Sequence, residues 1–423
     1  MNESNEVFER EMEGNAELGG AKYRQTAGNN NGAGKALILL VTMLPQTATA
    51  MVSMVPPVMA NQIATTLGLS PKVAGLYVAL VYLGAVISSS FTASLITRWG
   101  PLRTSFACVI TGGLGLCLMA VPHLAAALLA TAIIGLSYGP LTPASSHVLA
   151  RYRTSTAIAF VVSVRQTSVP LGGALAGAVA PPLVIGIGWN TTCVALGLAT
   201  AILGAVFWFS LHIVRNEPPE PPHGHGTSLL QPARFILRSL DLTVLAVSSM
   251  VYAAMQLVLS SFLVVYLTNA TDVDLISAGA LLSASQLAGV AGRLGWGFVA
   301  DRIHSPRMVL VTIALLMAVA TALMGLFSPA WSFFGLALVI VIVGGTASGW
   351  NGVYLSEIMR EVKPAEAGLA TSGSLMFTYL GIIFGPVLFG LLAAQIGYPN
   401  AYFAMAASVF ATGLLMAIAP RRN

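Results

Sequence analysis

Long apolar segments alternate with short polar connections over most of this 423-residue chain. A bilayer core requires about 20 mostly apolar residues for each helical crossing. The pattern predicts twelve transmembrane helices, at residues 36–60, 72–97, 104–121, 124–148, 155–180, 189–212, 240–268, 275–298, 307–327, 331–354, 366–394 and 398–419. Sheets are excluded because lipid offers no partner for an open edge, and barrel strands would alternate with short turns. The expected fold class is therefore all-α, in a polytopic membrane protein.

Two polar stretches divide the chain. Residues 1–35 are acidic and then rich in Asn and Gly, which predicts a disordered cytoplasmic tail without a cleavable signal peptide. Residues 215–239 are rich in proline and predict a cytoplasmic central loop between two six-helix halves, at 36–214 and 240–423. His223 and His225 in this loop are interpreted as incidental rather than as a metal site. The three cysteines lie in apolar runs without metal-ligand spacing, so no metal or cofactor is expected.

Charge is scarce and unevenly placed. Only 8% of the residues are charged and 56% are hydrophobic, whereas a soluble domain carries about 25% charged residues. This composition excludes an ordinary soluble enzyme, a disordered protein and a nucleic-acid binder. Nearly all basic residues lie in the tail, the central loop, the carboxyl terminus or the connections after alternate helices, and only Lys72 falls on the opposite side. The positive-inside rule then predicts that both termini are cytoplasmic. The expected location is the inner (plasma) membrane of the cell.

The two halves repeat a short motif. Gly297, Asp301 and Arg302 end predicted helix 8, and Arg98 and Gly100 follow helix 2 at corresponding positions. Thr97 stands where the second copy has its aspartate. On this motif, residues 36–420 resemble the major facilitator superfamily. The resemblance implies twelve helices in two pseudo-repeats, a usually monomeric state, and secondary transport by rocker-switch alternating access at a site between the halves.

The same resemblance implies which residues control conformational change. The first copy of the loop motif usually helps to lock the cytoplasmic gate, although its missing carboxylate weakens that role for Thr97. Prolines and glycines inside helices 5 and 11 permit kinks and close helix contacts. The predicted gating and conformational residues are Gly297, Asp301, Arg302, Arg98, Gly100, Pro170, Gly385 and Pro386.

Two arginines lie within predicted helices, whereas no carboxylate lies at a helix centre. Arg165 falls near the middle of helix 5 and Arg293 in the cytoplasmic third of helix 8. Intramembrane charge is costly and usually functional, and arginine matches carboxylate or phosphate geometry. Structural alternatives remain open, because Arg165 could bind carbonyls freed by Pro170, and Arg293 could snorkel to the surface or pair with Glu357. The segment from Arg293 to Asp301 also resembles oxalate/formate and monocarboxylate carriers, in which the helix-8 arginine binds the carboxylate.

Polar residues on helices 1, 4, 7, 8 and 11 could line the remaining cavity, although single polar side chains in helices are more often packing contacts. The predicted substrate-binding residues are Arg165, Arg293, Gln46, Thr49, Tyr138, Gln286, Tyr252, Gln256 and Tyr379.

Three functions compete. The first is a secondary transporter of a small organic anion, by symport or antiport, with a proton as a candidate coupling ion. The alternative is an exporter of neutral or amphiphilic compounds, as in drug efflux. An enzyme or a sensor is disfavoured, because the predicted helices carry no paired carboxylates, HExxH motif or Ser/His/Asp grouping, and the sequence has no nucleotide-binding loop. The expected partners are a small-molecule substrate and the lipid bilayer, without nucleic acid.

Overall fold

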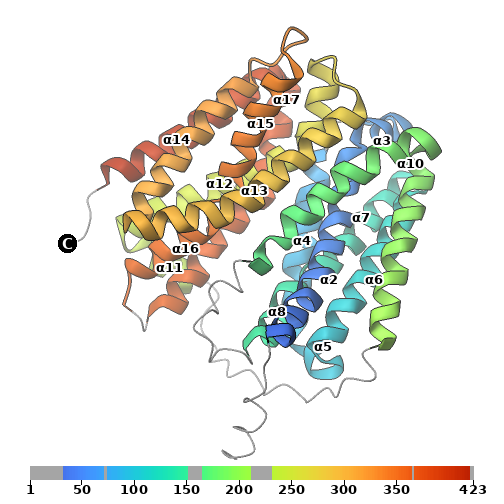
Figure 1. Cartoon of the computed structure of the whole chain (residues 1–423), viewed down its shortest axis with the longest axis horizontal. Coiled ribbons are helices and arrows are strands. Elements are labelled where there is room, and N and C mark those ends of the chain that lie inside the picture. The colour runs from blue at the N-terminus through green and yellow to red at the C-terminus, as the bar shows by residue number, and fades with distance from the viewer. Residues whose placement is uncertain (1–31, 71–73, 151–163, 211–230, 364–365, 420–423) are drawn as a thin grey trace, which may run out of the picture.

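A computed structural model describes residues 32–70, 74–150, 164–210, 231–363 and 366–419. These residues form helices and connections, and no strand occurs among them (Figure 1). The helices are α2 (Gly32–Val58), α3 (Ala60–Leu67), α4 (Ala74–Ser89), α5 (Thr92–Trp99), α6 (Pro101–Met119), α7 (Leu124–Tyr138), α8 (Leu141–Ala150), α10 (Ser168–Ser210), α11 (Gln231–Leu237), α12 (Leu240–Ala270), α13 (Leu275–Ile303), α14 (Pro306–Met324), α15 (Phe333–Ala347), α16 (Asn351–Arg360) and α17 (Ala367–Ile418).

The all-α membrane class predicted from the sequence is confirmed. Within the described ranges, nine helices are long and apolar enough to cross a membrane, or ten if α4 and α5, bent by 58° at their junction, form one span. Two of the nine contain 47 and 51 residues. At 1.5 Å per residue each would extend about 70 Å, more than twice a 30 Å bilayer core. The number twelve stays a prediction.

Glycine reverses the chain inside these two long helices. Gly188 in α10 (φ 79°, ψ 159°) and Gly397 in α17 (φ 82°, ψ 161°) leave helical geometry. In Figure 1 the green ribbon of α10 turns back on itself, as a hairpin of two crossings does. These glycines fall between predicted segments 155–180 and 189–212, and between 366–394 and 398–419.

Other predicted segments are interrupted helices. Segment 124–148 consists of α7 and α8, which break at Gly139 and Pro140, and segment 331–354 contains the break between α15 and α16. Proline removes a backbone donor, which explains the first break. The central loop predicted at 215–239 contains helix α11, and its residues up to 230 lie outside the described part of the chain, as do the tail to residue 31 and Lys72.

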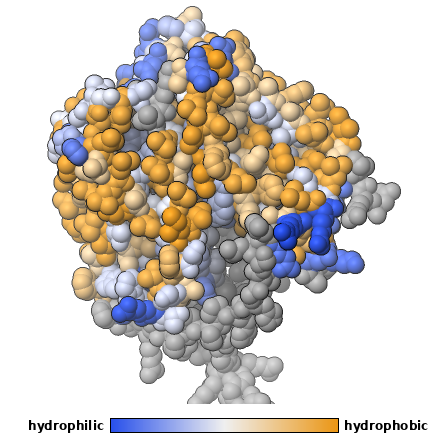
Figure 2. Space-filling view, turned by 180° about the vertical axis from the view of Figure 1, so that it is seen from behind, coloured by the Kyte–Doolittle hydropathy of each residue, from blue (hydrophilic) through white to orange (hydrophobic). Residues whose placement is uncertain are grey.

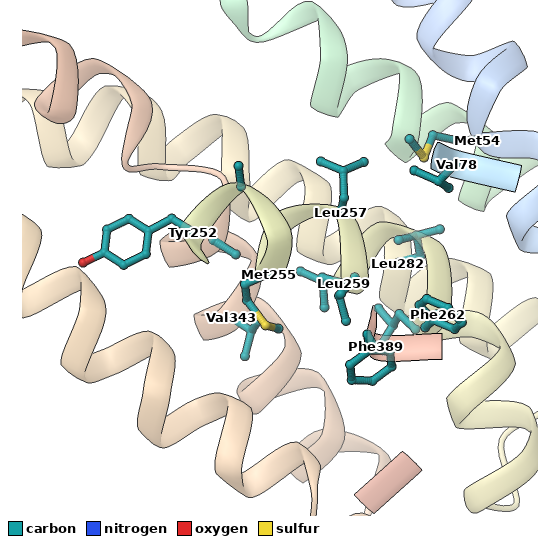
Figure 3. Close-up of a cluster of buried hydrophobic side chains, with 14 of the residues drawn as sticks. Met54, Val78, Tyr252, Met255, Leu257, Leu259, Phe262, Leu282, Val343 and Phe389 are labelled. Carbon is teal, nitrogen blue, oxygen red and sulfur yellow. The ribbon is translucent and has the colours of Figure 1, made fainter. Parts of the chain in front are cut away.

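Elements α2–α10 pack together and elements α11–α17 pack together, and these groups are named here the N-terminal half and the C-terminal half (Figure 1). The halves meet where α10 contacts α13, α4 contacts α17, and α2 contacts α12. Helix α12 is almost entirely buried. Figure 3 shows its apolar side chains packed among neighbours from several helices, including Phe262 against Phe389 with ring centroids 5.0 Å apart.

Apolar side chains cover the outside of the helices. Figure 2 shows an extensive hydrophobic surface, with hydrophilic residues gathered toward the ends of the molecule. Large apolar residues such as Phe298 (68% exposed) and Phe334 (77% exposed) lie on this surface. A soluble monomer rarely exposes such an extensive apolar face, so this surface fits contact with lipid chains.

The halves are in close contact at one end, which is named here the closed end. Asn61 of α3 donates a 3.0 Å hydrogen bond from Nδ2 to Oγ1 of Thr268 in α12. A Cβ atom at Gly75 would overlap the carbonyl oxygen of Pro386 across the interface. At the opposite end, which carries the motif arginines, α5 and α8 lie apart from α11 and α16 in Figure 1. The described conformation is therefore closed at one end of the interface.

Gly188→Ala should destabilise the protein. A side chain at φ 79° and ψ 159° is strained, and such backbone strain costs on the order of 1–3 kcal/mol. The midpoint of thermal unfolding in detergent should fall by several degrees. Gly186→Ala is the matched control, because an added Cβ meets nothing within 4 Å there and φ is not positive. Equal midpoints for the two variants would refute the assigned reversal at Gly188.

Cysteines at Asn61 and Thr268 should cross-link in the described conformation, because these two side chains are in direct contact. The pair is introduced into a variant without the three native cysteines, and cross-linking is read by peptide mapping. Transport should stop when the pair is linked and return on reduction. Thr97→Cys with Asp301→Cys, at corresponding exposed positions of the opposite end, provides a control pair that should stay unlinked. A failure of the first pair to link would contradict the closed end.

Candidate functional site

Arg293 in α13 connects the two halves. Its Nε donates to the carbonyl oxygen of Ser348, at 2.9 Å, and its Nη1 donates to the carbonyl oxygen of Gln166 in the N-terminal half. Ser348 lies in the break between α15 and α16, and Gln166 lies just before α10. Backbone carbonyls at helix breaks lack a helical donor, so a guanidinium satisfies them well. Part of the donor fork of Arg293 is therefore engaged in structure.

Arg165 has a different environment. Its side chain is 4% exposed, and its Nη1 is buried without a hydrogen-bond partner among the described residues. Among the residues that the structure describes, Nη1 of Arg165 does not bond to the carbonyls freed by Pro170, which was the structural alternative considered from the sequence. Leaving a buried charged donor unpaired is costly, so a ligand or water that accepts a hydrogen bond there would be stabilising.

Helix α2 contributes two further unpaired oxygens. Gln46 Oε1 and Thr49 Oγ1 are buried, and neither has a hydrogen-bond partner among the described residues. The side chain of Gln46 lies within hydrogen-bonding reach of Tyr138, which is also within electrostatic range of Arg165. The structure therefore brings together four predicted substrate-binding residues of the N-terminal half.

Two further tyrosines join this group, Tyr82 of the same half and Tyr379 of the C-terminal half. The rings of Tyr82 and Tyr138 meet edge to face with centroids 5.5 Å apart. Tyr379 of α17 lies within electrostatic range of both tyrosines, and Arg293 lies within range of Tyr82, Tyr138 and Arg165. Tyr379 is 42% exposed, so part of its ring remains accessible. We call Gln46, Thr49, Tyr82, Tyr138, Arg165, Arg293 and Tyr379 the central cluster.

Other predicted substrate-binding residues lie elsewhere. Tyr252 is fully buried, donates a hydrogen bond to the carbonyl of Leu310 and packs edge to face on Trp350, so the structure places it in the core of the C-terminal half. Figure 3 shows its ring extending away from α12. Gln286 donates to Ser260 Oγ at 2.9 Å, beside Gly173 of α10. Gln256 is half-buried on α12.

Polar side chains of the C-terminal half bond largely to one another. Thr378 Oγ1 donates to Ser249 Oγ at 3.0 Å, and Tyr354 shares a short hydrogen bond with Ser374. The role of Tyr354 was missed in the sequence, where only its position near the end of predicted helix 10 could have suggested it. The unpaired polar atoms of the central cluster therefore come from the N-terminal half.

The two loop motifs share a positive φ but differ in ψ, which is 160° at Gly100 and 23° at His304. Gly100 (φ 81°) and His304 (φ 56°), which follow the two motif arginines at corresponding positions, both have positive φ. The side chains of Arg98, Asp301 and Arg302 are exposed, and Arg360 of α16 donates to the carbonyl of His304 at 3.0 Å. An added Cβ at Gly297 meets nothing within 4 Å, so packing does not require glycine there.

Pro170, Gly385 and Pro386 occupy helix interfaces. Pro170 is buried in the first turn of α10. A Cβ at Gly385 would overlap Ala254 of α12, and Pro386 meets Gly75 at the closed end. These contacts allow close helix packing, and their predicted part in conformational change stays a prediction.

Solved structures share this fold over nearly the whole chain. A bacterial homolog of the human lysosomal transporter Spinster, in an inward-facing and unoccupied conformation, matches with a TM-score of 0.67 at 17% identity, over 91% of this chain and 95% of its own. The nucleoside transporter NupG matches with a TM-score of 0.69 at 16% identity, over 90% and 99%. A POT family transporter in complex with 5-aminolevulinic acid matches with a TM-score of 0.70 at 15% identity, over 91% and 96%.

Sequence comparisons agree on the family. The multidrug resistance protein MdtG of Yersinia enterocolitica serotype O:8 / biotype 1B is 29% identical over 116 residues, and MdtG of Citrobacter koseri (strain ATCC BAA-895 / CDC 4225-83 / SGSC4696) is 30% identical over 120 residues. The matches span 27% and 28% of each chain, about a quarter of the length of these relatives. The model of the Major Facilitator Superfamily matches residues 46–372 and 245–423. The chain therefore belongs to the Major Facilitator Superfamily, and it is an integral membrane protein.

Proposed function

We propose that this transporter exports amphiphilic organic compounds by rocker-switch alternating access. The central cluster carries this proposal, because three tyrosines from both halves surround a few polar atoms at the interface. Binding sites for small organic molecules combine such aromatic surface with a few convergent polar groups. The local similarity to proteins named for multidrug resistance supports export more than uptake.

The organic anion expected from the sequence is the second candidate substrate. Arg165 favours it, because its buried Nη1 lacks a partner. No Asp or Glu occurs between Glu17 and Glu217, so no carboxylate in that half could neutralise this arginine. The two candidates meet in one compound class, an amphiphile whose apolar part contacts the tyrosines and whose anionic or strongly polar end meets Arg165.

The orientation is part of the proposal. We infer that the end with the motif arginines faces the cytoplasm of the inner membrane, with both termini on that side, because basic residues collect there. The described conformation, closed at the other end, would then be inward-facing. Function as a monomer and coupling to protons or to a second substrate are further expectations, and counting of protomers and transport in imposed proton gradients test them.

Tyr138→Ala should weaken export of amphiphilic compounds. Loss of aromatic contact costs about 0.5–1.5 kcal/mol, so transport at low substrate concentration should fall roughly two- to tenfold. The assay is accumulation of neutral and anionic fluorescent amphiphiles in an efflux-deficient bacterial host. Tyr138→Phe keeps the ring and should retain most export. Unchanged export by Tyr138→Ala of every compound would remove the central cluster from the transport pathway.

Arg165→Gln separates the two candidate substrates in the same assay. If the variant loses export of anionic compounds but keeps export of neutral ones, the substrate is an organic anion. If it keeps export of both, Arg165 does not take part in substrate recognition. Arg238→Gln changes an exposed arginine outside the cluster and the predicted gating residues, and it controls for expression and membrane insertion.

Arg165→Met and Arg293→Met should change stability in opposite directions without substrate. The first removes a buried charge with an unpaired donor, and unfolding should become less favourable by about 1 kcal/mol or more. The second removes two hydrogen bonds from a charged donor, each contributing about 1.5–3 kcal/mol. Thermal unfolding in detergent measures both, with Arg302→Met as the exposed control. Destabilisation by Arg165→Met would mean that this side chain is structural.

A further inference from the structure

Helix α2 presents two buried polar atoms, Gln46 Oε1 and Thr49 Oγ1, that have no hydrogen-bond partner among the described residues. The two residues are three positions apart, so they share one face of the helix. A hydroxyl inside a helix commonly donates to the carbonyl three or four residues earlier, and Thr42 and Ser53 of α2 do so at 3.0 and 2.9 Å. Thr49 makes no such bond, so its hydroxyl is available to a partner from outside the helix.

Packing on α6 and contact with Tyr138 orient these two side chains. The methyl group of Thr49 lies 3.7 Å from the position that a Cβ atom at Gly112 of α6 would occupy. Because methyl and hydroxyl branch from the same carbon, the hydroxyl points to a different side. The amide of Gln46 is within hydrogen-bonding reach of Tyr138. Since Oε1 of this amide is unpaired, the contact falls to its nitrogen, and the oxygen remains available.

Arg165 lacks a partner of the opposite kind. A guanidinium only donates hydrogen bonds, an amide oxygen only accepts them, and a hydroxyl does either. Nη1 of Arg165 is buried and unpaired among the described residues, and Arg165 lies within electrostatic range of the same Tyr138 that Gln46 reaches. The N-terminal half therefore leaves an unpaired donor and unpaired acceptors near one tyrosine.

A ligand with acceptors alone satisfies only part of this set. A plain carboxylate or sulfonate could accept from Arg165, but it would bring negative charge toward the oxygen of Gln46 and leave that oxygen unpaired, which is costly in a buried site. A ligand with donors alone would leave the arginine unpaired, which is more costly still. The ligand that satisfies the whole set both accepts and donates at its polar end.

We propose that the exported amphiphile carries a hydrogen-bond donor, a hydroxyl or N–H group, beside its anionic group. The anionic group accepts from Arg165, the donor group meets Gln46 Oε1, and the hydroxyl of Thr49 bonds to either. The apolar part contacts the tyrosines of the central cluster. This inference rests on the proposed function, and it narrows the substrate class to compounds such as hydroxy acids with an apolar tail.

The experiment compares octane-1-sulfonate with 2-hydroxyoctane-1-sulfonate, which differ by one hydroxyl group. A sulfonate stays ionised and carries no proton of its own, so the hydroxyl is the donor that distinguishes the two compounds. Isothermal titration calorimetry measures both dissociation constants on the purified full-length protein. The hydroxylated compound should bind roughly five- to 150-fold more tightly, because the plain sulfonate leaves a buried oxygen unpaired.

Gln46→Leu removes the acceptor at similar size, so the affinity ratio of the two sulfonates should fall toward one. Gln62→Leu is the matched control, because Oε1 of Gln62 in α3 is also buried without a partner among the described residues but lies outside the central cluster. This control should keep the ratio. If Gln46→Leu does not fold, Thr49→Val replaces it and should lower the ratio in part.

Two outcomes would overturn the donor group. Equal affinity of the unaltered protein for both sulfonates would mean that water rather than ligand pairs with Gln46, and a ratio unchanged in Gln46→Leu would place the hydroxyl elsewhere. Binding of neither sulfonate would overturn the anionic substrate of the proposed function together with this inference. The failure of the donor group and the failure of the anionic substrate are therefore distinguishable.

Discussion

The structure depends on the cost of placing charge where no water reaches. Hydrocarbon offers no hydrogen bonds, so a charged group must be paired, bonded to freed backbone atoms, or held at a membrane end. The C-terminal half uses pairing, as Asp241 and Arg307 show. The N-terminal half has no carboxylate of its own, because no Asp or Glu occurs between Glu17 and Glu217, so its cations need other partners.

Helix breaks supply the partners of Arg293, which lies in the C-terminal half. The break between α15 and α16 frees carbonyls near Ser348, and the residues before α10 do so near Gln166. Arg293 binds both, so its charge also connects the two halves. Its bonds would have to change if α10 and α13 slide past one another. The same arginine can therefore hold the two halves together in the described conformation and also respond to a ligand in the central cluster.

Apolar length and charge placement were sufficient to predict the all-α membrane class. The repeated loop motif supplied the family resemblance, and that resemblance implied a shared site for Arg165, Arg293 and Gln46. Bonding partners could not be predicted in this way. Arg293 binds backbone carbonyls, which every residue carries, so no side-chain pattern identifies them. Tyr252 lies on the same predicted helix face as the polar residue Gln256, which suggested a cavity. In the structure neighbouring helices bury Tyr252 completely. The Asp241–Arg307 pair joins residues 66 positions apart, and only packing of α12 against α14 decides that they meet.

Arg165 raises the question why an unpaired charge stays in a position where an apolar side chain would cost less. A buried charge without a partner destabilises a protein far more than an apolar side chain at the same position does. The empty site is therefore destabilised, and a ligand that pairs with Arg165 would remove this destabilisation. On the proposed function, binding of an anionic or strongly polar group would lower the free energy of the loaded, water-excluded site relative to the empty one. A ligand shifts a conformational equilibrium only through such a difference between states. The unpaired arginine then favours closure around substrate and disfavours closure without it, which is what coupling of transport to substrate requires.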